Sequence, residues 1–148
     1  MNSHDTVPGY LPAFPRRDEV LWRARADFPG VPTSVGAARA WLHDRLAARG
    51  IEAPENAGLI LSELATNAVH HTRSGLPDGR FAVRLLVHPH RFRLEVRDGG
   101  PFGNVHPLRR PTSDLMAEHG RGLILVDSFA ARWGRLANGH GMYAEVDR

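Results

Sequence analysis

Glu63 and Asn67 are residues of types that can hold a cation and move a proton, and they lie four positions apart. In an α-helix, with about 100° per residue, Glu63, Asn67 and His71 form one row beside an apolar stripe. A carboxylate and an amide oxygen that project together suit Mg²⁺, which takes oxygen ligands and is usually completed by substrate phosphates. The carboxylate could also orient an attacking hydroxyl group.

A second candidate is Asp98, which is followed by Gly99 and Gly100 at the end of an alternating segment. An aspartate that leaves a strand into glycines can direct its carboxylate at the amino group of a ligand. Glycines also allow the backbone to approach a flat ring closely. Adenine is one such ligand.

The third candidate is the sequence Gly120-Arg121-Gly122-Leu123, which runs directly into an apolar segment. Backbone N–H groups at the start of a helix, together with the helix dipole, form an anion site that needs no lysine. All nineteen cationic side chains are arginines, which excludes the lysine-dependent phosphate loop of the Walker type. Phosphate would fit such a site.

Each candidate alone also has a purely structural interpretation. Glu-x-x-x-Asn is usually a solvated helix edge, Asp-Gly is usually a turn, and Gly-x-Gly before a helix is a common packing device. Their order along the chain is more informative. An acidic helix, a strand that ends in Asp-Gly-Gly, a long loop and a Gly-x-Gly helix together outline a nucleotide site.

The elements that position these candidates follow from the hydrophobic pattern. Alternation predicts a strand over residues 20–28 with one buried face. Helical spacing predicts a helix with Thr33 or Ser34 as its N-cap and a stop at Gly50, which suits a left-handed C-cap. A second helix begins near Pro54 and carries the acidic row of the first candidate.

The rest of the pattern predicts two hairpins, a loop and a helix. These are a hairpin of residues 81–87 and 92–96, a loop over 101–119, a buried helix over 122–131, and a hairpin that pairs 132–136 with 142–146 across Asn138-Gly139. The loop is too long for an ordinary connection and is expected to be a functional lid. The fold class predicted is α/β, a two-layer sandwich in which a mixed, mostly antiparallel sheet is covered on one face by helices.

Composition indicates one globular domain. The chain has 148 residues, of which 42% are hydrophobic, and its first 18 carry three prolines. We expect residues 1–18 to form a flexible tail and residues 19–148 to form the domain. The net charge is only +3 and the arginines are spread along the sequence, so direct nucleic-acid binding is not expected. With no cysteine, no long apolar run and no signal peptide, a cytoplasmic protein without a membrane span is expected.

Taken in order, the candidates resemble the motifs of the GHKL ATPases, the fold shared by gyrase, histidine kinases and anti-sigma-factor serine kinases. Glu63 and Asn67 correspond to the N box, Asp98-x-Gly100 to the first glycine box, and Gly120-x-Gly122 to the second. The resemblance spans residues 20–146. It implies a GHKL ATPase fold with a long lid over ATP.

Within that family, residues 61–71 and 120–133 are most similar to the stand-alone serine/threonine kinases that act as anti-sigma factors. This resemblance implies ATP and Mg²⁺ as cofactors, with Asn67 as the metal ligand and Glu63 as general base. It also implies that Asp98 binds the adenine amino group. The remaining residues assigned to the ATP site and lid by resemblance are Gly100, Gly120, Arg121, Gly122 and Leu123.

Two functions are consistent with these expectations. The first is a protein kinase that phosphorylates an antagonist protein and also holds a sigma factor, and the presence of Glu63 favours it. The second is a non-catalytic switch that binds ATP only to select a protein partner. Phe102 replaces a glycine that is frequent in the family, and Gly141 lies near a frequent threonine, which leaves room for the second function. An autonomous histidine kinase is less favoured, and the resemblance also suggests a homodimer.

Overall fold

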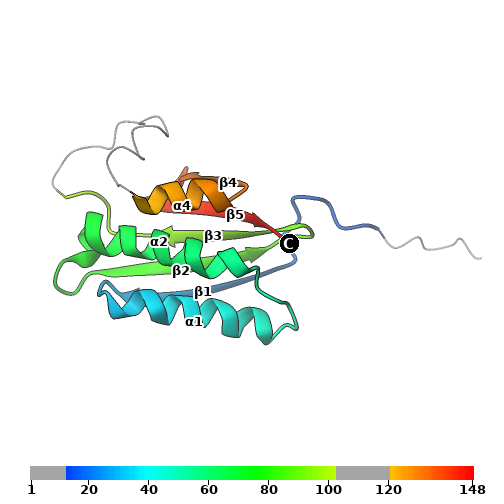
Figure 1. The fold of residues 1–148 in the computed structure, drawn as a ribbon, viewed down its shortest axis with the longest axis horizontal. Coiled ribbons are helices and arrows are strands. Elements are labelled where there is room, and N and C mark those ends of the chain that lie inside the picture. The colour runs from blue at the N-terminus through cyan, green and yellow to red at the C-terminus, as the bar shows by residue number, and fades with distance from the viewer. Residues whose placement is uncertain (1–12, 103–120) are drawn as a thin grey trace, which may run out of the picture.

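The computed structural model describes residues 13–102 and 121–148 of the chain (Figure 1). Its elements, in chain order, are β1 (Trp22–Pro29), α1 (Thr33–Ala47), α2 (Glu55–His71), a short 3-10 helix η1 (Arg73–Gly75), β2 (Arg80–Val87), β3 (Arg91–Arg97), α4 (Arg121–Phe129), β4 (Arg132–Arg135) and β5 (Gly141–Asp147). The first twelve residues of the predicted tail lie outside the described residues. So do Gly120 and the predicted lid, apart from its first two residues.

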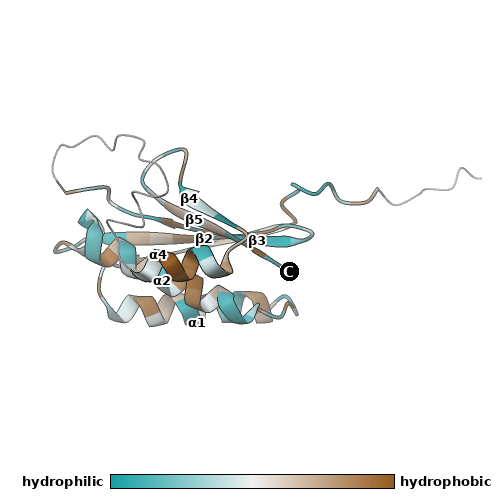
Figure 2. Ribbon diagram, turned by 45° about the horizontal axis from the view of Figure 1, so that its top comes forward, coloured by the Kyte–Doolittle hydropathy of each residue, from teal (hydrophilic) through white to brown (hydrophobic). Residues whose placement is uncertain are grey.

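The strands form one five-stranded sheet in the order β1-β2-β3-β5-β4. Every pairing among the described strands is antiparallel, so the parallel component allowed by the prediction is not found there. Figures 1 and 2 show α1, α2 and α4 on the same side of the sheet. The predicted α/β two-layer architecture is confirmed.

Alternation along the strands decides which side chains meet the helices. In β2 and β3 the apolar members of each alternating set are almost completely buried, and they are Phe81, Val83, Leu85, Val87, Phe92, Leu94 and Val96. They pack against a stripe of α2 that includes Ile60, Leu61 and Leu64, all at most 1% exposed. Burial of apolar surface on this scale is the main source of stability of the domain. It also fixes α2 in place across the sheet.

The boundaries of α1 differ in part from the prediction. The N-cap is Pro32, with φ of −54° and no side-chain cap hydrogen bond, rather than Thr33 or Ser34. Proline already has a helical φ and lacks the N–H that a cap would have to satisfy, so the helix begins one residue earlier. At the other end Gly50 has φ of +65°, and the predicted left-handed stop is confirmed.

The β4–β5 hairpin forms as predicted, with Trp133 opposite Ala144 and Arg135 opposite Met142. The strands are joined by residues 136–140, a loop that contains the predicted Asn138-Gly139 pair and is longer than a two-residue turn. Gly139 has φ of +77°, but Asn138 does not have the positive φ that a type I′ turn requires. The longer loop reaches back to the end of β3, where it contributes to the site described below.

Gly141 is required by the close approach of β5 to β3. Its φ is +141°, and an added Cβ would lie 2.1 Å from the carbonyl oxygen of Val96. We expect Gly141→Ala to lower the free energy of unfolding by about 2 kcal/mol or more. Gly36→Ala in the interior of α1 is the matched control: an added Cβ would make only an ordinary contact, 3.9 Å from the Arg39 side chain, and this change should raise stability by about 0.5–1 kcal/mol. Urea unfolding of both variants measures the difference, and equal midpoints would contradict the packing described here.

None of the helices in the described part of the chain has the length and hydropathy that crossing a membrane requires.

Candidate functional site

The predicted residues that the structure describes lie around the C-terminal half of α2, the start of α4 and the end of β3. Glu63 is half-buried on α2 and its carboxylate faces the first turn of α4. A Cβ added to Gly122 would lie 2.5 Å from Oε2 of Glu63. A larger residue at this position would require the end of the flexible Glu63 side chain to move from its observed place. The structure therefore brings together Glu63 and Gly122, which are far apart in the sequence.

Asn67 lies one helical turn beyond Glu63 and is also half-buried. Its amide nitrogen donates a hydrogen bond of 3.3 Å to Sδ of Met142 at the start of β5. Because the amide nitrogen makes this contact, the amide oxygen of Asn67 is the atom that can coordinate a cation. His71, the third member of the row, is exposed.

The donor set near Asn67 suits a magnesium ion that is completed by phosphate. Among the described residues there is no group of three or more His, Asp or Glu side chains that could hold a metal on its own. Mg²⁺ in nucleotide sites typically takes one or two protein ligands and fills its remaining positions with phosphate oxygens and water. One amide oxygen near a glycine-rich helix start fits that arrangement.

Asp98 lies directly after β3 and is held by its own turn. Its Oδ1 accepts a hydrogen bond of 2.7 Å from the backbone N–H of Gly100, whose φ is +84°. Burial raises the pKa of Asp98 above its ordinary value of 3.8, while the Gly100 N–H, His140 and Arg135 lower it in part. The net direction is upward because desolvation disfavours the charged carboxylate.

The 3-10 helix η1 fixes the glycine turn that follows Asp98. Ser74 is 1% exposed, and its Oγ accepts a hydrogen bond of 2.9 Å from the N–H of Gly99 while donating to the carbonyl oxygen of Arg80 at 2.6 Å. The N–H of Arg73 donates to the carbonyl oxygen of Gly100 at 2.9 Å. Two neighbouring residues of η1 thus hold both glycines of the turn, which pre-organises the carboxylate of Asp98.

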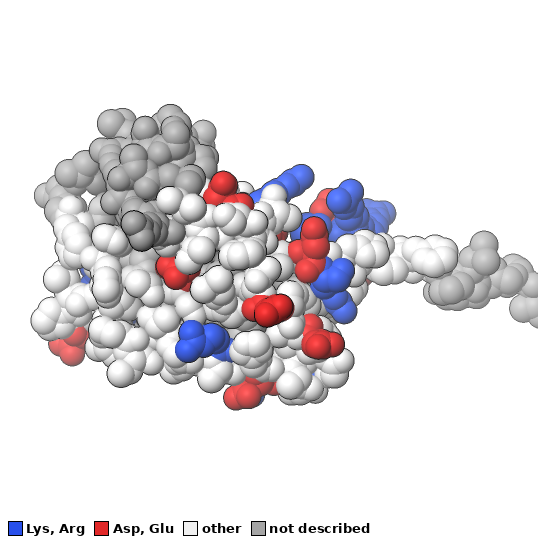
Figure 3. Space-filling model, in the orientation of Figure 1, with Lys and Arg blue, Asp and Glu red and all other residues white. Residues whose placement is uncertain are grey.

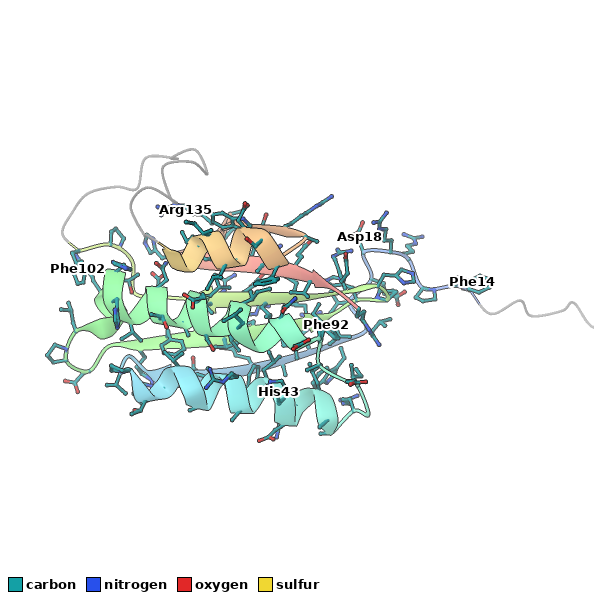
Figure 4. All side chains as sticks on the ribbon, in the orientation of Figure 1. Phe14, Asp18, His43, Phe92, Phe102 and Arg135 are labelled. Carbon is teal, nitrogen blue, oxygen red and sulfur yellow. The ribbon has the colours of Figure 1, made fainter. Side chains whose placement is uncertain are left out.

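Two residues near Asp98 were missed by the sequence analysis. The ring of His140 covers Gly100, where an added Cβ would lie 2.9 Å from Cδ2, and the His140 carbonyl oxygen accepts the N–H of Asp98 at 3.1 Å. Arg135 acts on the same carboxylate through its charge. Figure 4 labels Arg135 and Phe102 on the side of the molecule where α4 begins. Arg135 at the end of β4 and His140 in the following loop reach Asp98 only because β5 pairs with both β3 and β4, so local spacing carried no signal for either residue.

The glycine-rich motif is described in part. Gly120 lies outside the described residues, and Arg121 is the first residue of α4. The side chain of Leu123 is 2% exposed and packs in the core with Val126. Leu123 therefore anchors α4 through its side chain and can offer only backbone groups to a ligand. The first turn of α4 presents backbone N–H groups without intrahelical partners beside Glu63.

Comparison with known proteins agrees with this arrangement. The family model of the histidine kinase-like ATPase domain matches residues 28–142. The chain is also similar to the serine-protein kinase RsbW of Listeria monocytogenes serotype 4a (strain HCC23), with 24% identity over 133 residues, covering 84% of this chain and 75% of the relative. The same identity and coverage hold for RsbW of serotype 4b (strain F2365). Because the family model covers well over half of the sequence, the chain belongs to the histidine kinase-like ATPase domain family.

Proposed function

We propose that this protein is an ATP-dependent serine/threonine protein kinase that acts as an anti-sigma factor, phosphorylating an antagonist protein and binding a sigma factor. The observation that carries the proposal is the position of the Glu63 carboxylate against Gly122, with Asn67 one turn away on the same helix. A carboxylate beside a helix N-terminus that can hold phosphate is placed to act on a hydroxyl that attacks the phosphate. The similarity to a serine-protein kinase supports the same class of reaction.

In the proposed site, each described residue has one task toward the nucleotide. Asp98 accepts an N–H of the adenine amino group, and Gly100 lets the backbone approach the ring. Asn67 supplies an oxygen ligand to Mg²⁺. The first turn of α4 donates backbone N–H groups to the phosphates.

Bound ATP would supply the terminal phosphoryl group for transfer. A serine or threonine hydroxyl of the partner protein forms the new O–P bond as the bond between that phosphorus and its bridging oxygen breaks, which releases ADP. Glu63 accepts the hydroxyl proton, and its carboxylate lies beside Gly122 in the first turn of α4, where this proton would be released. Most of the rate of such a transfer comes from positioning and charge.

Calorimetric titration with ATP, with and without Mg²⁺, tests the nucleotide site. We expect saturable binding that Mg²⁺ strengthens. Asn67→Ala should lose this effect of Mg²⁺ and bind MgATP at least about tenfold more weakly. Loss of a residue that only hydrogen-bonds to a metal ligand typically costs about tenfold or more in affinity, and loss of the ligand itself should cost at least as much.

Three results would contradict part or all of the proposed kinase function. An Asn67→Ala variant that binds MgATP as tightly as the parent would show that Asn67 is not a Mg²⁺ ligand. Absence of binding at saturating nucleotide would remove the site as a whole. Binding without transfer to any protein substrate would instead leave the non-catalytic, ATP-dependent switch as the function.

A further inference from the structure

The sheet has a second face, on which the described part of the chain places no helix. Strand register assigns to this face the alternating residues that do not enter the core. We call it the arginine face, and its charged members are Arg23, Arg25, Arg80, Arg84, Arg91, Arg93, Arg97 and Arg132, with the acidic residues Asp27, Glu95, Glu145 and Asp147.

The arginine face carries the net charge of the protein. Eight arginines against four carboxylates give it a formal excess of four positive charges, whereas the entire chain has a formal charge of only +3. On the helix side, basic and acidic side chains are scattered with both signs present (Figure 3). Contact with solvent alone would not require an excess of arginines over carboxylates on this face. The excess gives the face a positive potential that attracts acidic partners.

Two of the four carboxylates of this face, Glu95 and Glu145, lie beneath the guanidinium groups, whereas Asp27 and Asp147 are exposed. Glu95 is 6% exposed and forms ion pairs with Arg93 at 2.9 Å, Arg84 at 3.3 Å and Arg97 at 3.5 Å. Glu145 is 8% exposed and pairs with Arg93 at 3.2 Å. Buried in this way, the acids hold the arginines in fixed positions while the surface presents mainly guanidinium N–H donors.

Three further arginines of the face have no acidic partner among the described residues. Arg23, Arg80 and Arg132 are exposed, belong to three different strands, and form no ion pair within the described part of the chain. Exposed guanidinium groups at several points on one sheet face suit planar carboxylates, which they can bind with two parallel hydrogen bonds. We propose that the arginine face is a docking surface for an acidic segment of a partner protein.

The chemistry of the face favours an acidic polypeptide over other occupants. A second copy of the chain would bring two positive faces together, which is unfavourable. Single-stranded nucleic acid usually binds sheet faces by stacking bases on aromatic side chains. Tyr143 is the only aromatic residue that these strands direct to the arginine face, and the guanidinium of Arg93 already covers its ring at 3.8 Å. The inference is independent of ATP, since no residue of the nucleotide site belongs to the face.

Fluorescence anisotropy with a labelled oligoglutamate peptide at low ionic strength tests the proposal. The double variant Arg23→Ser with Arg132→Ser removes two unpaired charges from the arginine face. The matched control, Arg45→Ser with Arg49→Ser, removes the same charge from exposed positions of α1 and the turn that follows it. We expect the face variant to weaken peptide binding about tenfold, and the control to change it by less than about twofold.

Three outcomes would overturn the proposal. An equal loss of affinity in both double variants would mean that general attraction to a cationic protein is the cause. No binding of the peptide by the parent would mean that the face does not recognise carboxylates. Tighter binding of an oligothymidylate of similar charge than of the peptide would assign the face to nucleic acid. MgATP affinity, measured on the same variants, should not change, so failure here is distinguishable from failure of the proposed kinase site.

Discussion

Replacing Glu63 by glutamine is expected to lower the rate of phosphoryl transfer by about 10²- to 10⁴-fold, the usual contribution of a positioned general base. Glutamine keeps the shape of the side chain and its place beside Gly122, but it cannot act as a base that accepts a proton. MgATP affinity should show no comparable change, because the carboxylate is not assigned to binding. Single-turnover transfer of labelled phosphate to the protein substrate, beside calorimetry with ATP, separates the two effects.

Glu55→Gln is the control for this prediction. Glu55 is exposed at the first turn of the same helix, so this variant has the same loss of charge at a distance from the site. It should transfer phosphate at the parent rate. If Glu63→Gln also transfers at the parent rate, the general base lies elsewhere, and a parallel loss of ATP affinity would indicate a role in binding.

Asp98→Asn is expected to separate ligand affinity from stability. Asparagine can still accept the Gly100 N–H through its oxygen, but its amide nitrogen is a donor where the adenine amino group also donates. Hydrogen bonds to charged groups contribute about 1.5–3 kcal/mol, so the dissociation constant for ATP should rise by about 10- to 100-fold. Calorimetric titration at neutral pH measures this loss.

The stability of the same variant should move in the opposite direction. Burial raises the pKa of Asp98, so the folded protein binds this proton more tightly than the unfolded chain. Stability is therefore lost as pH rises from the ordinary value of the group through its raised folded value, and the loss persists at neutral pH. The neutral amide in the variant has no charge to desolvate, and we expect a higher melting temperature at neutral pH. Asp44→Asn, an exposed control on α1, should leave the melting temperature unchanged.

The pH dependence of ATP binding by the parent follows from the same shift. The carboxylate of Asp98 must be ionised to accept an amino N–H with full strength. Affinity should therefore weaken on acidification at a pH above the ordinary range of aspartate, because the pKa of Asp98 is raised. A pH profile that is the same in Asp98→Asn would show that another group controls the affinity.

The sequence predicted most of the fold because its strands and helices have clear periodicities. The α2 stripe and the alternation of β2 and β3 identify the core directly. The start of α1 was not predicted, because a proline with helical φ replaced the expected side-chain cap at Thr33 or Ser34. Local chemistry alone does not decide between these two ways of starting a helix.

Parts of the candidate site depend on contacts between distant segments, and these were beyond prediction from local patterns. His140 and Ser74 reach the Asp98 turn only after β5 has paired with β3 and η1 has folded against the glycines. The position of the arginines was also not predictable from local patterns. They are spread along the sequence, yet strand register places eight of them on one face. The sequence alone therefore did not reveal the charged surface.

Strand order also has a consequence for how the domain folds. The β2–β3 and β4–β5 hairpins are local in sequence, whereas β1 must pair with β2 across the whole of α1 and α2. Local contacts cost less loop-closure entropy, so we expect the hairpins to form first and the non-local pairings later. Asn67 and the Asp98 turn are joined to β5 by one of these later pairings. A ligand held there would selectively stabilise the fully assembled sheet, and partly folded forms would gain nothing from its presence.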